Sequence, residues 1–179
     1  KVRQTLHKSV KELLGENIKN SDFTEKTWYY KQEHGQDFEI EVADFKVSYK
    51  ENELKANGFV TLAQGITKID VAVEAIRREQ NWEEKLLTRL KLYKNFFDTF
   101  KPGTEGINEK PYILFVCEDK KHMAEVYKVM AMNNIELEGK AYFTYDLLQM
   151  EPSLENTWHQ FVHEDQKIKL QPLNIELLK

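Results

Sequence analysis

The stretch that decides the fold is residues 67–100, TKIDVAVEAIRREQNWEEKLLTRLKLYKNFFDTF. Its first part, residues 68–76, predicts a buried strand, because apolar residues recur there and alternate residues of a strand share one face. By that period Val71 and Val73 lie on one face and Glu74 lies on the other. A carboxylate in such apolar surroundings is costly unless it is paired. Glu74 therefore needs a partner from elsewhere in the chain.

The second part of the stretch, residues 81–100, predicts a long amphipathic helix with Arg89 on its apolar face. We expect Arg89 to be mostly buried and paired with Glu74. Such a contact is either a structural ion pair or part of an active site, and the sequence leaves both open. For a structural pair, Arg89→Met is expected to be milder than Glu74→Ala. The apolar face is formed by Trp82, Leu86, Tyr93, Phe96, Phe97 and Phe100.

Length and composition are those of one ordinary globular domain. The chain has 179 residues, of which 41% are hydrophobic and 31% charged, with a formal charge of −4. An acidic total means that any nucleic-acid binding must use a local basic patch. The single cysteine, Cys117, cannot form an internal disulfide, which fits a reducing compartment. Since no apolar run is long enough to span a membrane, we expect a cytoplasmic protein without a membrane partner.

The remaining pattern predicts an α/β fold with a mixed central sheet, antiparallel at the start and then built by parallel crossovers, flanked by helices on both faces. Residues 28–76 read as an antiparallel meander with a turn at 50–53. Strands at 112–117 and 141–145 enclose a helix at 120–132. We assign residues 1–163 to a single domain and residues 164–179 to a C-terminal tail.

One group of acids resembles the ligand set of a metal-dependent phosphodiesterase. Asp44 and Glu74 fall at strand positions where they could bind a divalent ion such as Mg²⁺, with Glu33 as a third ligand and Arg89 beside the phosphate. The nuclease fold that builds its site this way carries a lysine two residues after the strand acid. Ile76 stands at that position here. The alternative is a Glu74–Arg89 pair that only anchors the helix.

A second group is basic. Arg77, Arg78 and Lys85 lie at the start of the central helix and could contact DNA phosphates. The alternative is an ordinary solvated face, which is the commoner reason for such charges.

A third candidate is a pair of histidines, His159 and His163, on a short helix expected at residues 154–162. Spaced four apart on a helix, they would share one face and could bind zinc. No third ligand is apparent in the sequence, so a structural role is the commoner reading.

Three stretches together resemble the plasmid replication-relaxation family of Gram-positive bacteria. The first is DFKV at 44–47. The second is VEAIR at 73–77, followed by RLKLY at 89–93. The third is FTYDLL at 143–148, with Trp158 beyond it. Their order and spacing cover most of residues 28–158.

The resemblance implies a restriction-endonuclease-like core similar to PD-(D/E)xK nucleases, and a winged-helix domain upstream of Lys1. It also implies a DNA-associated accessory protein of a plasmid or mobile element, in replication or conjugative relaxation, with protein partners in that complex. The family commonly carries an acid where Ile76 stands. We therefore expect a degenerate site without a cofactor. The alternatives are an active divalent-metal-dependent DNA nuclease, with Asp44 and Glu74 holding Mg²⁺, and a protein–protein interaction module.

Overall fold

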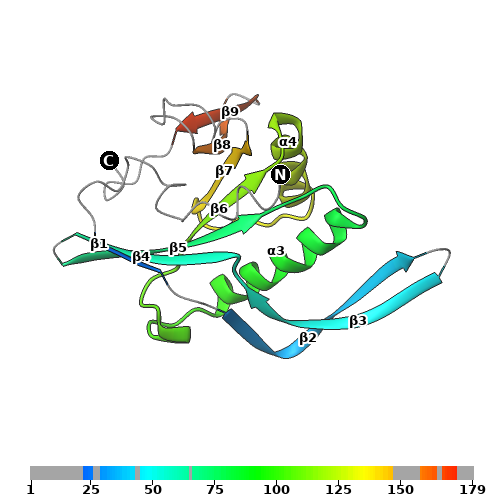
Figure 1. Cartoon of the computed structure of the whole chain (residues 1–179), viewed down its shortest axis with the longest axis horizontal. Coiled ribbons are helices and arrows are strands. Elements are labelled where there is room, and N and C mark those ends of the chain that lie inside the picture. Colours follow the sequence, from blue (N-terminus) through cyan, green and yellow to red (C-terminus); the bar gives the residue numbers. More distant parts are fainter. Residues whose placement is uncertain are drawn as a thin grey trace.

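The computed structural model describes residues 22–25, 29–42, 45–64, 66–146, 158–164 and 167–172 (Figure 1). In these residues five strands precede the first described helix, and two helices then separate the next strands. The elements are β1 (Asp22–Glu25), β2 (Tyr29–Val42), β3 (Phe45–Lys55), β4 (Gly58–Gln64), β5 (Thr67–Ala75), α3 (Trp82–Thr99), the 3₁₀ turn η2 (Thr104–Gly106), β6 (Tyr112–Cys117), α4 (Lys120–Met132), β7 (Ala141–Tyr145), β8 (His159–Glu164) and β9 (Lys167–Pro172).

The main sheet is seven-stranded, in the order β1-β4-β5-β6-β7-β8-β9. β4 pairs with β5 in antiparallel fashion, and β5, β6 and β7 then run parallel through the crossover helices α3 and α4. This confirms the predicted mixed α/β sheet, with an antiparallel part followed by parallel crossovers.

The strands β2 and β3 form a separate two-stranded ribbon that extends away from the main sheet in Figure 1. Their register pairs Tyr29 with Lys55 at one end and Val42 with Phe45 at the other. The meander predicted for residues 28–76 is therefore right about the antiparallel pairs β2–β3 and β4–β5, but wrong between β3 and β4, which lie in different sheets. The predicted turn at 50–53 is also wrong, because β3 continues there. Polar residues there suggested a turn, but backbone pairing in a ribbon needs no apolar side chains.

Both described helices pack on the same face of the sheet. The chain moves from β5 to β6 to β7 in one direction, and crossovers of one hand then place successive helices on one side. Ala72, Phe115 and Phe143 point from the strands toward the helices. The opposite face carries Val71, Leu114 and Trp158 among its buried residues. For the described helices, the expectation of helices on both faces is wrong.

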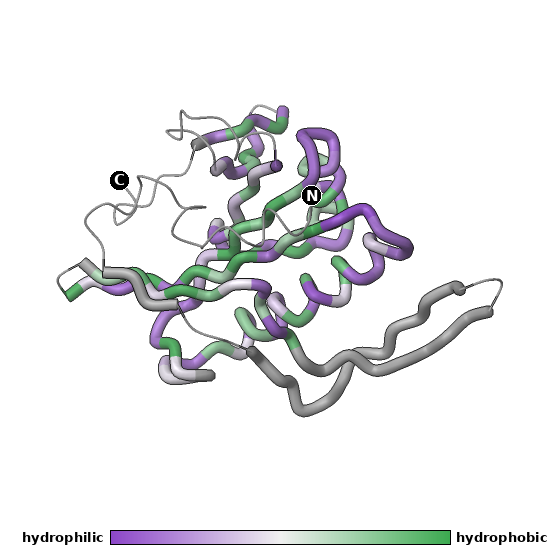
Figure 2. The backbone as a smooth tube through the Cα atoms, in the orientation of Figure 1, coloured by the Kyte–Doolittle hydropathy of each residue, from purple (hydrophilic) through white to green (hydrophobic). Residues whose placement is uncertain are grey.

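Figure 2 shows hydrophobic residues concentrated along the central strands and hydrophilic ones at the outer turns.

The residues that precede the two described helices explain where each helix begins. Asp119 caps α4, because its side chain accepts a hydrogen bond from the backbone N–H of His122 at 2.7 Å. Asn81 precedes α3 in a left-handed conformation with φ 59°, which an asparagine tolerates better than most residues. The predicted bounds of β6, α4 and β7 agree with the structure.

The C-terminal part differs from the prediction. His159–Glu164 is strand β8, paired in antiparallel fashion with β9, so the helix expected at 154–162 is wrong from His159 onward. Residues 154–157 of that prediction lie outside the described residues. β9 lies within residues 164–179, which the sequence analysis assigned to a C-terminal tail.

Candidate functional site

Glu74, Arg89 and Tyr93 form a buried polar cluster between β5 and α3. Arg89 donates from Nη2 to both carboxylate oxygens of Glu74, at 2.7 and 2.6 Å, and from Nε to Oε2 at 3.0 Å. The hydroxyl of Tyr93 donates to Oε1 of Glu74 at 2.5 Å. Both oxygens of the carboxylate are therefore occupied by donors from the helix. The predicted contact between Glu74 and Arg89 is confirmed.

Burial dominates the electrostatics of this cluster. Glu74 is only 1% exposed. Burial raises the pKa of its carboxyl group, and the charge of Arg89 and the hydrogen bonds from Tyr93 and Arg89 partly offset that rise. Burial and the neighbouring Glu74 charge also hold the pKa of the Tyr93 hydroxyl well above its usual range. The Tyr93 hydroxyl therefore stays protonated near neutral pH and keeps donating its hydrogen bond to Glu74.

Arg89 also joins the cluster to the ribbon. Its Nη2 donates to the backbone carbonyl of Lys55 at 2.7 Å, and its side chain is 31% exposed. Beside it lies a small recess of about 180 Å³, whose lining includes Asn57, Trp82 and Lys85. The guanidinium therefore fastens β3 and β5 to α3.

Glu74, one of the two predicted Mg²⁺ ligands, has its carboxylate engaged within the protein. Both oxygens of Glu74 accept hydrogen bonds from Arg89 and Tyr93, so neither is open to a cation. Asp44 lies outside the described residues. Its described neighbours, Val42 and Phe45, lie at the end of the ribbon opposite Lys55. At about 3.3 Å per residue, Phe45 is roughly 30 Å from Lys55 along β3.

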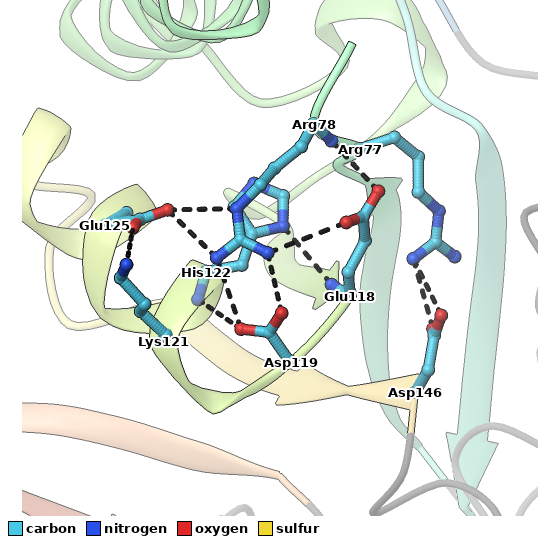
Figure 3. Close-up of polar contacts among 8 residues, drawn as sticks. All are labelled: Arg77, Arg78, Glu118, Asp119, Lys121, His122, Glu125 and Asp146. Atoms are coloured by element: carbon cyan, nitrogen blue, oxygen red, sulfur yellow. Dashed lines mark hydrogen bonds and ion pairs between the residues drawn. The ribbon is translucent and has the colours of Figure 1, made fainter.

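The predicted DNA-contacting arginines lie at the carboxyl ends of the parallel strands, beside acidic residues (Figure 3). Arg77 binds both carboxylate oxygens of Asp146 through Nη1, at 3.0 and 3.1 Å. Only 10% of its side chain is exposed. Within the described part of the chain, its Nε and Nη2 atoms are buried and have no hydrogen-bond partner. Arg77 is therefore mostly buried and paired with Asp146, the residue that directly follows β7.

Arg78 is held by three acids that follow β6 or lie on α4. It contacts Asp119 at 2.6 Å, Glu125 at 3.1 Å and Glu118 at 3.6 Å. Asp119 and Glu125 hold the pKa of Arg78 well above its usual range, mainly through the hydrogen bond to Asp119. Behind them, burial lowers the pKa of His122, whose Nδ1 accepts the backbone N–H of Glu118 at 3.2 Å.

The third predicted cation, Lys85, contacts Glu79 at 3.1 Å, and both side chains are largely exposed. The structure thus places Arg77, Arg78 and Lys85 in one region but gives each an acidic partner. Sequence reasoning missed those partners. For Arg78 one signal was present, because Asp119 directly precedes a predicted helix, where an acidic capping residue is favoured.

The two histidines lie on strand β8, not on a helix. At about 3.3 Å per residue, their Cα atoms lie roughly 13 Å apart along the strand, too far to share one zinc ion. His163 instead forms a hydrogen bond through Nε2 with the hydroxyl of Tyr127. In the part of the chain that the structure describes, no three His, Cys, Asp or Glu side chains are grouped so that they could hold a metal ion.

The chain matches no model of a known protein family and no curated protein. None of the helices in the described residues is both long and apolar enough to cross a membrane.

Proposed function

We propose that this chain is a cytoplasmic, DNA-associated accessory protein of a plasmid or mobile element, with a restriction-endonuclease-like core that does not cleave DNA. The observation that carries the non-catalytic part is the closed Glu74 cluster. A carboxylate that must hold a catalytic cation needs open oxygens. Here Arg89 and Tyr93 occupy both.

The DNA-associated part rests on the resemblance to the replication-relaxation family. The observed order of a strand with Glu74, a helix with Arg89 and a parallel return strand is compatible with such a core. A winged-helix domain upstream, and protein partners in a replication or transfer complex, belong to the same proposal.

A nicking assay tests the absence of catalysis. Supercoiled plasmid is incubated with the protein and either magnesium or manganese, beside Glu74→Gln, which keeps the side-chain volume. We expect no nicking by either protein. Metal-dependent nicking that disappears in Glu74→Gln would instead establish the active nuclease.

A second experiment measures duplex binding by fluorescence anisotropy at several salt concentrations. Contacts to phosphate predict that affinity falls steeply with salt, with a slope of log affinity against log salt concentration of roughly −0.9 per neutralised phosphate. Arg78→Gln and Lys85→Gln should weaken binding to all sequences alike. Lys91→Gln serves as the control, because Lys91 is an exposed cation on the same helix as Lys85.

A specific observation favours a second candidate, a protein–protein interaction module. Arg77, Arg78 and Lys85 already contact acids of this chain, which lowers the positive potential available to phosphate. If the duplex does not bind even at low salt, this candidate takes precedence over the DNA proposal.

A further inference from the structure

The β8–β9 hairpin ends the described sheet with an exposed apolar face. Ile168 is 55% exposed and Leu170 is 40% exposed. The register places Leu170 opposite Phe161 and Ile168 opposite His163, and residues directly opposite each other point to the same face. Phe161 stacks on Tyr127 of α4 at 4.2 Å between ring centroids. The two exposed residues therefore extend the face of the sheet that α4 covers.

A groove of about 380 Å³ runs beside this face, between α4, β7 and β8. Its walls include Tyr127, Met130, Ile135 and Phe161. Tyr127 is held by its hydrogen bond with His163. The apolar surface next to β9 is therefore formed by side chains that contact one another, among them Tyr127, Phe161 and His163.

The opposite face of β9 is basic. Lys167 and Lys169 alternate with Ile168 and Leu170 along the strand. Lys169 contacts Glu164 at 2.7 Å, and about half of its side chain remains exposed. Lysines on an edge strand oppose pairing with neutral or basic strands. They attract a strand that carries acidic residues at the matching positions.

β9 also offers its backbone. Among the described strands it pairs with β8 alone, so its other edge faces no described strand. A strand whose second edge is unpaired can accept the main chain of an extended segment, and its side chains then select which segment fits.

We propose that the edge of β9 that faces no described strand binds an extended peptide segment of a partner protein in which apolar and acidic residues alternate. The apolar side chains lie beside Ile168 and Leu170, on the face of the groove. The acidic side chains lie beside Lys167 and Lys169, on the other face. This surface is separate from the Glu74 cluster and does not depend on DNA binding.

A second copy of this chain fits the edge less well. If Ile168 faced itself or Leu170 of another copy in an antiparallel pair, a lysine would face a lysine on the other side. Like charges placed directly opposite destabilise a strand pair.

The test uses a labelled, capped heptapeptide, Glu-Val-Glu-Val-Glu-Val-Glu, and fluorescence anisotropy with the full chain. The same peptide with lysine in place of glutamate should bind at least about tenfold more weakly. The acidic peptide N-methylated on every residue, which lacks N–H donors on both edges, should lose affinity to the same degree. The double variant Ile168→Thr with Leu170→Thr keeps residues suited to a strand and should also weaken binding about tenfold or more.

Ile66→Thr is the matched control, because Ile66 is fully exposed in the turn between β4 and β5, and it should leave binding unchanged. Equal affinity for the lysine peptide, retained binding of the N-methylated peptide, or no binding of the acidic peptide would each overturn the proposal. Dimers that form with increasing protein concentration and exclude the peptide would also overturn it, in favour of a second copy at this edge.

Discussion

The two partners of the buried ion pair differ in their access to water. Glu74 is 1% exposed, whereas the side chain of Arg89 is 31% exposed. A guanidinium that loses its partner can turn toward solvent, but a carboxylate that loses its partner stays buried. From these exposures we expect Arg89→Met to cost more stability than Glu74→Ala, which is the opposite of the order predicted from the sequence, because removal of Arg89 leaves a buried carboxylate without its counter-charge.

We predict that Arg89→Met loses about 3–5 kcal/mol of unfolding free energy near pH 8 and clearly less near pH 5. Without Arg89, the pKa of the Glu74 carboxyl group in the folded state rises further above its ordinary value. An acid with a raised folded-state pKa contributes its full stability below the unfolded pKa. That stability is lost as the pH rises through the folded pKa. Urea unfolding at both pH values measures the difference.

Lys91→Met is the control for this prediction, since Lys91 is exposed on the same helix. It should change stability little at either pH. A loss for Arg89→Met that does not vary with pH would mean that Glu74 remains ionised without its partner, and would contradict the argument.

At the scale of elements, Asp119 links the end of β5 to the start of α4. It accepts a hydrogen bond from the backbone N–H of His122 and contacts Arg78 at 2.6 Å. The hydrogen bond from Arg78, and then the one from His122, lowers the pKa of Asp119 to about 2. One carboxylate thus serves both as a helix cap and as an ion-pair partner.

Two substitutions separate these roles. Asp119→Ala removes the cap and the charge, and should cost about 0.5–2 kcal/mol near neutral pH. Asp119→Asn keeps a good capping residue, so it should cost less than Asp119→Ala. Its remaining cost is the lost ion pair with Arg78, which is small because 53% of the Asp119 side chain is exposed.

The pH dependence follows from the lowered pKa. The ion-pair contribution of Asp119 is present above its ordinary pKa of 3.8 and is lost as the pH falls toward about 2. Chemical unfolding monitored by circular dichroism should therefore show wild type and Asp119→Asn converging in acid. Equal stability of the Asn and Ala variants near neutral pH would contradict the capping role.

For the whole molecule, the sheet should be most stable at β6. That strand is paired on both sides, and Ile113, Leu114 and Cys117 are fully buried. β9 lies at the end of the described sheet and carries exposed side chains. Local opening requires less free energy where few apolar contacts are buried.

Native-state hydrogen exchange tests this gradient. We expect the amides of β6 to exchange only through global unfolding, and those of β9 to exchange many times faster through local opening. Protection of β9 equal to that of β6 would show that another segment covers this edge.

The sequence by itself determined the elements from β5 to β7 and the facing of Glu74 toward Arg89. These follow from local periodicity, because the positions of apolar residues along a short segment decide both the element and its buried face. The bounds of β6 and α4, and the hydrogen bonds between Glu74 and Arg89, agree with that reasoning.

Only the tertiary structure decided the separate ribbon, the common face of α3 and α4, and the strand at His159–Glu164. It also decided that Arg77 meets Asp146, a residue 69 positions away. Strand partners and charge partners come from distant parts of the chain, and local periodicity carries no information about which segments meet. Whether a cation pairs with an acid of the same chain or stays available to a phosphate depends on which segments the fold brings together.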